Sequence, residues 1–435
     1  MTHKAAPSDT IAAPDATVTV ERLGAQGDGV ARTDTGPVFL PFTAPGDRVR
    51  VTWAPDRKGR QTASTAHIET AGDGRADPVC DHYGRCGGCR LQHVTDAVYA
   101  DFVRDKIHAA LSQHGLGDTP LAPPRISPPG SRRRLVLAAR VRNRAVQLGF
   151  HEARSHRIVA VEACPVARPA LVALLPTIRA FLADALDDGR DQQATLTLTE
   201  TDTGVDLTVT AAVDPGLAAR EAAAALAEDH DLAAINWTTD AAPETLVRRR
   251  APTMDFGTGA AEIPLPPAAF IQATAEGEAA LRAVIADACA GAHRVADLFC
   301  GLGTFAVPLA RSAGVRAVEG SRALLDALDT GARRSRLRHP IQTEHRDLFR
   351  RPLLAAELAP MDAVVIDPPR AGAKAQAEAL AASTVPVIAA VSCNPATFAR
   401  DARVLVDGGY RLERLQPVGQ FLWSAHVELA AVFRR

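Results

Sequence analysis

The sequence predicts an α/β protein in three parts: an OB-like β-barrel in residues 15–70, a central α/β domain in residues 71–262 and a Rossmann-like domain in residues 263–435. Short strand patterns separated by Gly and Pro turns fill the first part, as in a small barrel. In the last part, β-branched apolar runs alternate with helical patterns, which is typical of a doubly wound parallel sheet. The middle part mixes both patterns and carries a cysteine-rich segment.

Composition places the chain among globular proteins of two or three domains. Of its 435 residues, 47% are hydrophobic and 23% are charged. No apolar run reaches the roughly 18 residues of a membrane span, and the N-terminus lacks the apolar segment of a signal peptide. We therefore expect a cytoplasmic protein, a monomer with no membrane contact, whose seven cysteines are reduced, ligated or catalytic.

The charge distribution is more informative than the net charge of −1. Arginine-rich clusters lie at residues 132–134, 140–144, 154–157, 248–250 and 333–338. A solvated surface explains any one of them. Five together make a basic patch for nucleic acid a working hypothesis.

The N-terminal part has the turns of a barrel. Residues 1–14 are small and polar with Pro, which indicates a disordered tail. Strand patterns follow, and the turns Gly27-Asp28-Gly29 and Pro45-Gly46-Asp47 lie between them. These residues resemble a TRAM domain, an RNA-binding barrel often joined to RNA-modifying enzymes.

The central part begins with three cysteines, Cys80, Cys86 and Cys89, and a fourth, Cys164, precedes a Pro much later. Three thiolates within ten residues can converge on one soft metal centre. The Cys-x5-Cys-x2-Cys spacing and the following Cys-Pro favour a 4Fe–4S cluster, with a zinc site as the alternative. The rest of this part is expected to contain helices over 95–114, 169–186 and 217–226 and strands over 135–142, 145–150, 195–199 and 205–210.

The Rossmann-like part opens with the pattern of a nucleoside site. Asp297 ends a strand, and Gly301 and Gly303 follow in a turn that lets the chain pass tightly beneath a nucleoside. Glu319 ends the next strand, where it can accept from both ribose hydroxyls, and Asp347 follows the third, in reach of an adenine amine. Because the third Gly of a dinucleotide fingerprint is absent, this order favours an S-adenosylmethionine site over a pyrophosphate site.

Two later strand ends carry reactive groups. Asp367-Pro-Pro-Arg370 follows one apolar strand, and Cys393-Asn-Pro395 follows the next. In an open parallel sheet both ends lie at the carboxyl edge, where ligands bind. A thiol there can attack an electrophilic carbon if its pKa is lowered or a base is near. The alternative is a buried structural cysteine.

Four motifs carry a resemblance to a known family: Asp297-Leu-Phe-Cys-Gly-Leu-Gly-Thr-Phe305, Asp367-Pro-Pro-Arg-Ala-Gly372, Ser392-Cys-Asn-Pro395 and His426-Val-Glu428. Over residues 15–435 the chain resembles the RNA uracil-C5 methyltransferases, and it is most similar to the iron–sulfur branch that modifies 23S ribosomal RNA. The resemblance implies a Rossmann-like methyltransferase domain that uses S-adenosylmethionine (SAM). It also implies an RNA substrate, with ribosomal RNA expected ahead of transfer RNA.

The resemblance also implies roles for single residues. Cys393 would be the nucleophile that adds to uracil C6, and Glu428 the base that removes the C5 proton. The other residues expected to line the cofactor and uracil site are Gln272, Phe299, Thr304, Glu319, Asp347 and Asp367. The 4Fe–4S cluster would be held by Cys80, Cys86, Cys89 and Cys164. Cys289 and Cys300 are assigned to packing.

Three other functions compete with this one. An N-methyltransferase would place an aromatic residue after the Pro-Pro turn, where Arg370 stands, and would need no thiol. A noncatalytic RNA-binding assembly factor would form no covalent adduct with fluorouracil-containing RNA. A redox enzyme would need a second cofactor motif, which the sequence lacks.

Overall fold

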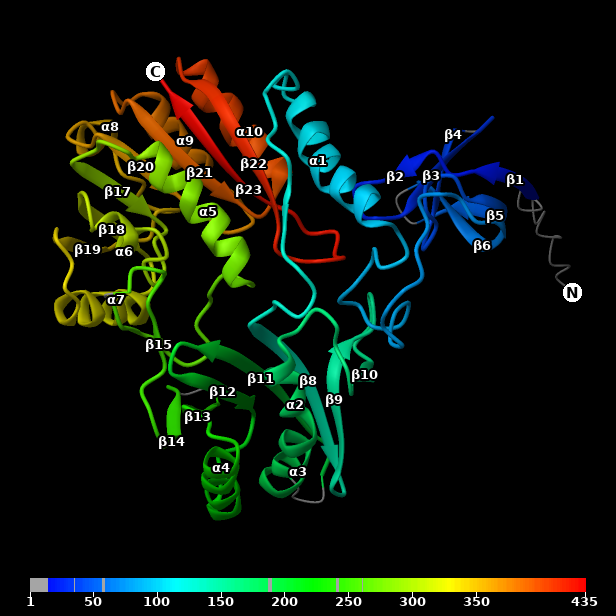
Figure 1. The fold of residues 1–435 in the computed structure, drawn as a ribbon, viewed down its shortest axis with the longest axis horizontal. Helices are drawn as coiled ribbons and strands as arrows, with labels where there is room; N and C mark the ends of the chain where they lie inside the picture. Colours follow the sequence, from blue (N-terminus) through cyan, green and yellow to red (C-terminus); the bar gives the residue numbers. More distant parts are fainter. Residues whose placement is uncertain (1–14, 35, 57–58, 187–189, 240–241, 260) are drawn as a thin grey trace, which may run out of the picture. The chain divides into compact units, whose positions relative to one another are not determined.

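The computed structural model describes residues 15–34, 36–56, 59–186, 190–239, 242–259 and 261–435 (Figure 1). The tail predicted for residues 1–14 lies outside this range. The chain forms two compact units, of which the first comprises the described residues up to Gly84 with Cys89–Phe102 and the second comprises Arg85–Gly88 with Val103–Arg435. No helix among the described residues is both long and apolar enough to cross a membrane.

The first unit contains a six-stranded sheet with the order β1-β5-β6-β4-β3-β2. Its strands are β1 (Asp15–Thr19), β2 (Arg22–Leu23), β3 (Gly29–Thr33), β4 (Gly36–Leu40), β5 (Arg48–Pro55) and β6 (Gln61–Thr70). Alternate residues of β5 face a small apolar core that includes Val49, Val51 and Trp53. This alternation is the pattern of a strand with one face on a core and the other toward solvent.

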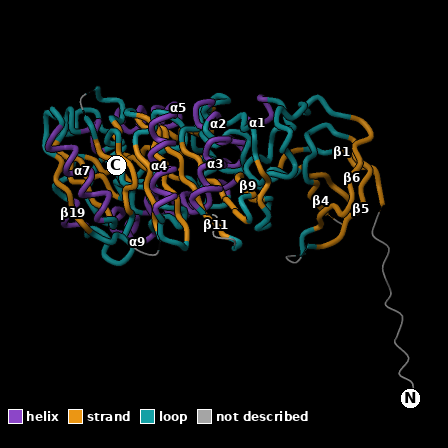
Figure 2. The backbone as a smooth tube through the Cα atoms, turned by 90° about the horizontal axis from the view of Figure 1, so that it is seen from below, coloured by secondary structure: helices purple, strands orange, loops and turns teal. Residues whose placement is uncertain are grey.

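In the second unit, the central region is built on a seven-stranded sheet with the order β10-β9-β8-β11-β12-β13-β14. Its strands are β8 (Arg134–Arg142), β9 (Ala145–His151), β10 (Ile158–Ala160), β11 (Gln192–Thr201), β12 (Gly204–Ala211), β13 (Ala234–Thr238) and β14 (Glu244–Arg248). The helices α2 (Pro169–Ala173), α3 (Leu175–Ala185) and α4 (Leu217–Asp229) supply the apolar core on one face of this sheet (Figure 2). The single helix predicted over 169–186 is divided, because Pro176 has no N–H to continue the helical hydrogen bonds.

The C-terminal region is an eight-stranded sheet with the order β19-β18-β17-β20-β21-β23-β22-β7. Its strands are β7 (Arg125–Ile126), β17 (Arg294–Leu298), β18 (Gly314–Glu319), β19 (Ile341–His345), β20 (Ala363–Ile366), β21 (Val387–Ser392), β22 (Arg411–Gly419) and β23 (Glu428–Arg434). The first five strands of that order run parallel and β23 runs antiparallel to β21. The predicted doubly wound sheet is therefore confirmed.

Helices connect and cover these strands: α5 (Ala275–Ala288), α6 (Ala306–Leu309), α7 (Arg322–Arg334), α8 (Ala355–Leu358), α9 (Lys374–Ala381) and α10 (Pro395–Asp407). Two short strands, β15 (Thr253–Met254) and β16 (Ile263–Pro264), pair with each other, and the helix α1 (Asp96–Ser112) follows the cysteine-rich segment. In Figure 1, α5 lies across the strands β21, β22 and β23, against which it packs.

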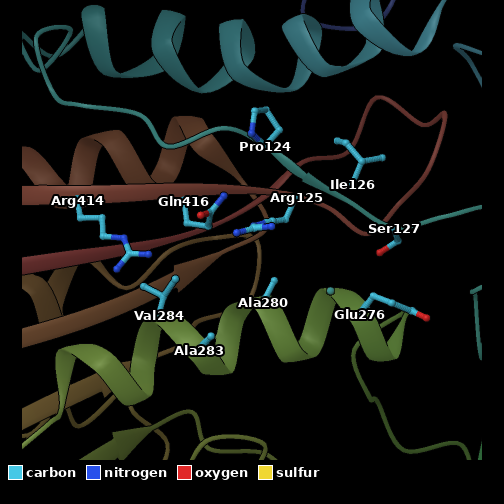
Figure 3. Close-up of a pocket in the computed structure, with 11 residues that line it drawn as sticks. Pro124, Arg125, Ile126, Ser127, Glu276, Ala280, Ala283, Val284, Arg414 and Gln416 are labelled. Carbon is cyan, nitrogen blue, oxygen red and sulfur yellow. The ribbon is translucent and has the colours of Figure 1, made fainter.

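The strand β7 was not predicted. It pairs in parallel with the end of β22, and the Nε2 of Gln416 donates to the Pro123 carbonyl at 2.7 Å. A short segment that precedes the central sheet thus forms the edge of the C-terminal sheet. Between β7, β22 and α5 lies a groove of about 540 Å³, into which the side chains of Arg125 and Arg414 extend (Figure 3).

Candidate active site

Two neighbouring strand ends form the centre of the site. Asp367 follows β20 and Cys393 follows β21, and these strands are parallel and paired. The Asn394 side chain caps α10 by accepting from the Ala396 N–H at 3.2 Å, and its Nδ2 donates to the Arg370 carbonyl at 2.9 Å. Asn394 therefore ties the Pro-Pro turn to the thiol-bearing turn.

The Cys393 thiol is half-buried and lies directly before the N-cap of α10. Burial raises its pKa, the charges of Glu428 and Asp367 raise it further, and Arg370 opposes the rise. The partial positive charge of a helix N-terminus favours a thiolate. In the free enzyme the thiol is thus protonated at neutral pH, and its ionisation depends on the charge state of the two carboxyls.

Those two carboxyls are themselves held away from water. Glu428 is the first residue of β23, and burial raises its pKa to about 7 although Gln420 and Arg370 lower it. The pKa of Asp367 is raised well above its ordinary value by burial and then by the charges of Glu428 and Asp297. A carboxyl with a pKa near 7 can take up and release a proton at working pH, as a general base must.

The third element of the site is a pair of buried amides. The Nε2 of Gln420 donates to the Oε1 of Gln272 and to the Oε2 of Glu428, both at 2.7 Å. The Ala273 N–H donates to the Oε1 of Gln420 at 3.0 Å. Gln272 and Glu428, which the sequence singled out separately, are thus joined by Gln420, which it did not. Gln420 lies in a turn between two strands, and no local pattern marks such a residue.

The loop after β17 forms a cradle beside an unsatisfied carboxyl. Asp297 is fully buried and neither of its oxygens has a hydrogen-bond partner among the described residues. Burial raises its pKa to about 8, which the nearby Ala306 N–H opposes and the charge of Glu319 reinforces. Gly301 has φ +56°, and a Cβ there would meet no atom within 4 Å. Open backbone next to a buried acceptor fits a nucleoside cofactor that carries an ammonium group, such as SAM.

The other predicted cofactor residues lie at the same edge of the sheet. Glu319 ends β18 and accepts from the N–H groups of Gly301 at 3.1 Å and Ser321 at 2.8 Å. Asp347 follows β19 and accepts from the Phe349 N–H at 3.0 Å. The rings of Phe299 and Phe349 lie 5.4 Å apart. Thr304, in the turn before α6, is partly buried.

The predicted cluster cysteines are divided between the two compact units, and each of them is half-buried. Cys80 and Cys89 belong to the first unit, whereas Cys86 and Cys164 belong to the second. Within the part of the chain that the structure describes, no group of three or more His, Cys, Asp or Glu side chains is arranged to hold a metal. The Gly88 N–H donates to the Cys86 Sγ at 3.5 Å, a contact of the kind that supports cluster thiolates.

Two further cysteines are packing residues, as predicted. Cys289 and Cys300 lie in the apolar core of the C-terminal region. Burial raises the pKa of Cys289 to about 12 and also raises that of Cys300. Neither thiol therefore competes with Cys393 as a nucleophile.

The parallel sheet, its glycine cradle and the acidic strand ends define a SAM-dependent methyltransferase domain, joined to a small β-domain. Two family models match the chain: the TRAM domain of tRNA (uracil(54)-C(5))-methyltransferase over residues 17–70, and tRNA (Uracil-5-)-methyltransferase over residues 341–435. The crystal structure of the Pyrococcus abyssi tRNA (uracil-54, C5)-methyltransferase with S-adenosyl-L-homocysteine shares the fold, with a TM-score of 0.75 and 22% identity over 96% of this chain and all of that one.

Full-length relatives are closer in sequence. An uncharacterized RNA methyltransferase of Rhizobium meliloti is 42% identical over 96% of this chain and 99% of its own length. The 23S rRNA (uracil(1939)-C(5))-methyltransferase of Chromohalobacter salexigens is 34% identical over 96% of this chain and 89% of its own length. The chain belongs to the family of SAM-dependent RNA uracil-5-methyltransferases.

Proposed function

We propose that this enzyme methylates uracil C5 in 23S ribosomal RNA through a covalent adduct between Cys393 and uracil C6. The observation that carries the proposal is the meeting of a thiol and a base of pKa about 7, Glu428, at the carboxyl edge of a methyltransferase sheet. Transfer RNA is the alternative substrate, because the structurally similar protein of Pyrococcus abyssi acts on tRNA.

The first chemical task is the addition of a thiolate. Uracil C5 is a poor nucleophile until a thiolate adds at C6 and makes an enolate, and Cys393 supplies that bond. The N-terminus of α10 and the guanidinium of Arg370 favour the thiolate, whereas ionised Glu428 and Asp367 disfavour it. The thiol proton leaves to solvent as the bond from sulfur to C6 forms, and Glu428 must be ionised when it later accepts the C5 proton.

The second task is to hold the reactants in line. When bound, SAM supplies the methyl group for the C5 carbon of the enolate. Asp297 would accept from its ammonium group, Glu319 from its ribose, and Asp347 would lie near its adenine, with Phe299 and Thr304 in the same wall. Asp367 and Gln272 would hold the uracil edge.

The last task is release of the product. The C5 proton must leave before the bond between Cys393 and C6 can break. Glu428 is a buried carboxyl whose pKa near 7 suits that transfer, and the proton it takes leaves to solvent before the next turnover. The target base reaches such a pocket only after it is unstacked from the RNA.

The test is direct assay of the purified enzyme. With methyl-labelled SAM it should convert uridine to 5-methyluridine in unmodified 23S rRNA, and the Cys393→Ala variant should not. Transfer RNA is the matched control substrate. Methylation of tRNA alone would replace the ribosomal assignment, and labelled cytidine or adenosine would overturn the reaction itself.

We also propose a 4Fe–4S cluster held by Cys80, Cys86, Cys89 and Cys164. Support comes from the spacing of the thiols and from the N–H donated by Gly88 to the Cys86 sulfur. Anaerobically purified protein should be brown, with about four irons per chain, and Cys86→Ser should lose this iron while Cys289→Ser retains it. A colourless protein that holds one zinc would contradict the assignment.

A further inference from the structure

We propose that Gln420 is a positioning residue that sets two groups of the active site at once. It turns the amide of Gln272 so that its NH2 group faces the target base, and it holds one oxygen of Glu428 so that the other is presented to the C5 proton. This inference rests on the proposed function, because it assigns Gln272 and Glu428 to the uracil site.

The orientation of the Gln420 amide follows from one backbone contact. An N–H group can only donate, so the oxygen of Gln420 must be the atom that faces the Ala273 N–H at 3.0 Å. Its nitrogen then has two hydrogens for two acceptors, the Oε1 of Gln272 and the Oε2 of Glu428. Gln420 is only 1% exposed, so water does not compete for these bonds. In the opposite orientation the NH2 group of Gln420 would face the Ala273 N–H, and its oxygen would face the oxygens of Gln272 and Glu428, so none of the three contacts would pair a donor with an acceptor.

The orientation passes on to Gln272. Because its Oε1 accepts from Gln420, its NH2 group is turned away from Gln420, and this group donates to no acceptor among the described residues. An NH2 group is complementary to a carbonyl oxygen and mismatched to an amine. Uracil carries a carbonyl oxygen at C4, whereas cytosine carries an amine there. The hydrogen bond from Gln420 thus makes Gln272 select uracil.

The second bond acts on the base. Gln420 donates to the Oε2 of Glu428, and this hydrogen bond stabilises the ionised carboxylate and lowers its pKa against the effect of burial. The other oxygen of Glu428 is left for the proton. Loss of Gln420 should therefore raise the pKa of Glu428 and shift proton removal to higher pH.

The surrounding backbone holds Gln420 in this place. Arg133 donates from its backbone N–H to the Ala273 carbonyl at 3.0 Å and from its Nε to the Gln272 carbonyl at 3.2 Å. A Cβ at Gly277, in the first turn of α5, would lie 2.6 Å from the Gln420 Cβ. The absence of a side chain at Gly277 is thus what gives Gln420 its space.

The test compares Gln420→Leu with Gln416→Leu. Gln416 is a buried glutamine of the neighbouring β22, bonded to the carbonyls of Pro123 and Pro417 and outside the network, so it controls for loss of a buried amide. In single-turnover reactions with uridine-containing RNA, Gln420→Leu should slow release of the methylated adduct about tenfold or more. The midpoint of its pH–rate profile should move upward, and its preference for uridine over cytidine in competing RNAs should fall. Gln416→Leu should match the wild type in all three.

Two outcomes overturn the inference. If release, pH midpoint and base preference in Gln420→Leu equal those of Gln416→Leu, Gln420 is only structural. If Gln420→Leu does not fold, Gly277→Ala takes its place, since it displaces Gln420 without removing a polar group, and wild-type behaviour there would count equally against the inference. If the wild type forms no adduct with fluorouracil-containing RNA, the proposed function fails, a result distinguishable from both.

Discussion

Buried carboxyls of two regions behave in opposite ways. In the N-terminal unit, burial alone would raise the pKa of Asp47, but hydrogen bonds from Arg75, the Ala44 N–H at 2.7 Å and the Gly72 N–H at 3.0 Å outweigh it, and the pKa is lowered. In the C-terminal sheet, Asp297 is as deeply buried, but neither of its oxygens has a hydrogen-bond partner among the described residues. The nearby Ala306 N–H opposes the effect of burial only in part, and the pKa of Asp297 rises to about 8.

The contrast separates a structural carboxyl from a functional one. The carboxylate of Asp47 accepts hydrogen bonds from Arg75 and from the Gly72 N–H, and so fixes the Pro45-Gly46-Asp47 turn to Gly72. Its oxygens are therefore not available to a ligand. Asp297 and Glu428 retain acceptor capacity that the protein itself does not use. A buried carboxyl without hydrogen-bond partners destabilises a fold. Several such carboxyls at one sheet edge are therefore expected where a bound ligand supplies the missing hydrogen bonds.

The largest expected effect is on catalysis. Under the proposed mechanism, Glu428→Gln still allows addition and methyl transfer, but it should slow proton removal by roughly 10²–10⁴. A methylated protein–RNA complex should accumulate and survive denaturing electrophoresis. The complex should vanish in the double variant Cys393→Ala, Glu428→Gln. Normal turnover by Glu428→Gln would remove it from the role of base.

The same substitution should have opposite effects on stability in the two regions. Asp47→Asn removes the partner of Arg75, whose side chain is 19% exposed, and should lower the local stability of the first unit by about 3 kcal/mol. Asp297→Asn removes an unpaired buried acid and should stabilise the cofactor-free sheet at pH 8 while weakening SAM binding. Hydrogen exchange of β5 and β17 measures both, and a loss of protection in β17 would contradict the comparison.

The pH dependence of stability should also differ in sign between the two regions. The lowered pKa of Asp47 contributes stability that is present above its ordinary value near 3.8 and is lost as pH falls through the folded value. The raised pKa of Asp297 acts in reverse: between about 4 and 8 the folded state keeps a proton that the unfolded chain releases, so stability falls as pH rises. Exchange rates in β17 should therefore rise toward pH 8 beyond their intrinsic increase, and Asp297→Asn should flatten this slope.

The smallest expected effect is that of Arg370. Like Arg75 beside Asp47, Arg370 is an arginine that lowers the pKa of neighbouring acidic groups, but its side chain is exposed. Arg370 lowers the pKa values of both Cys393 and Glu428. Arg370→Ala should slow alkylation of Cys393 by iodoacetamide at pH 7 by less than about tenfold, since one pKa unit is a factor of ten in thiolate. Arg311→Ala, an exposed change outside the strand-end site, is the control. Faster alkylation in Arg370→Ala would show that the guanidinium shields the thiol instead.

Features carried by local pattern were predictable. The strand ends at Asp297, Glu319, Asp367 and Cys393 follow short apolar runs, and a parallel sheet brings such ends to one edge. Gln420 and the strand β7 were not predictable, because each depends on a partner far along the chain that no local pattern specifies. With only two residues, β7 is also too short to show the alternation of apolar and polar residues that predicts a strand. The missing partners of Asp297 are likewise a property of packing alone.

The edge strand β7 has a consequence for the order of synthesis. Pro123 and Gln416, which join β7 to β22, are 293 residues apart. At ribosomal rates of about 5–20 residues per second, the earlier segment waits roughly 15–60 s for its partner. The central sheet between them can fold in that time, whereas the methyltransferase sheet cannot gain its edge strand until β22 (Arg411–Gly419) has been synthesised. An unpaired β22 edge would be open to association with other chains, so nascent chains that lack residues 123–126 should depend more on chaperones.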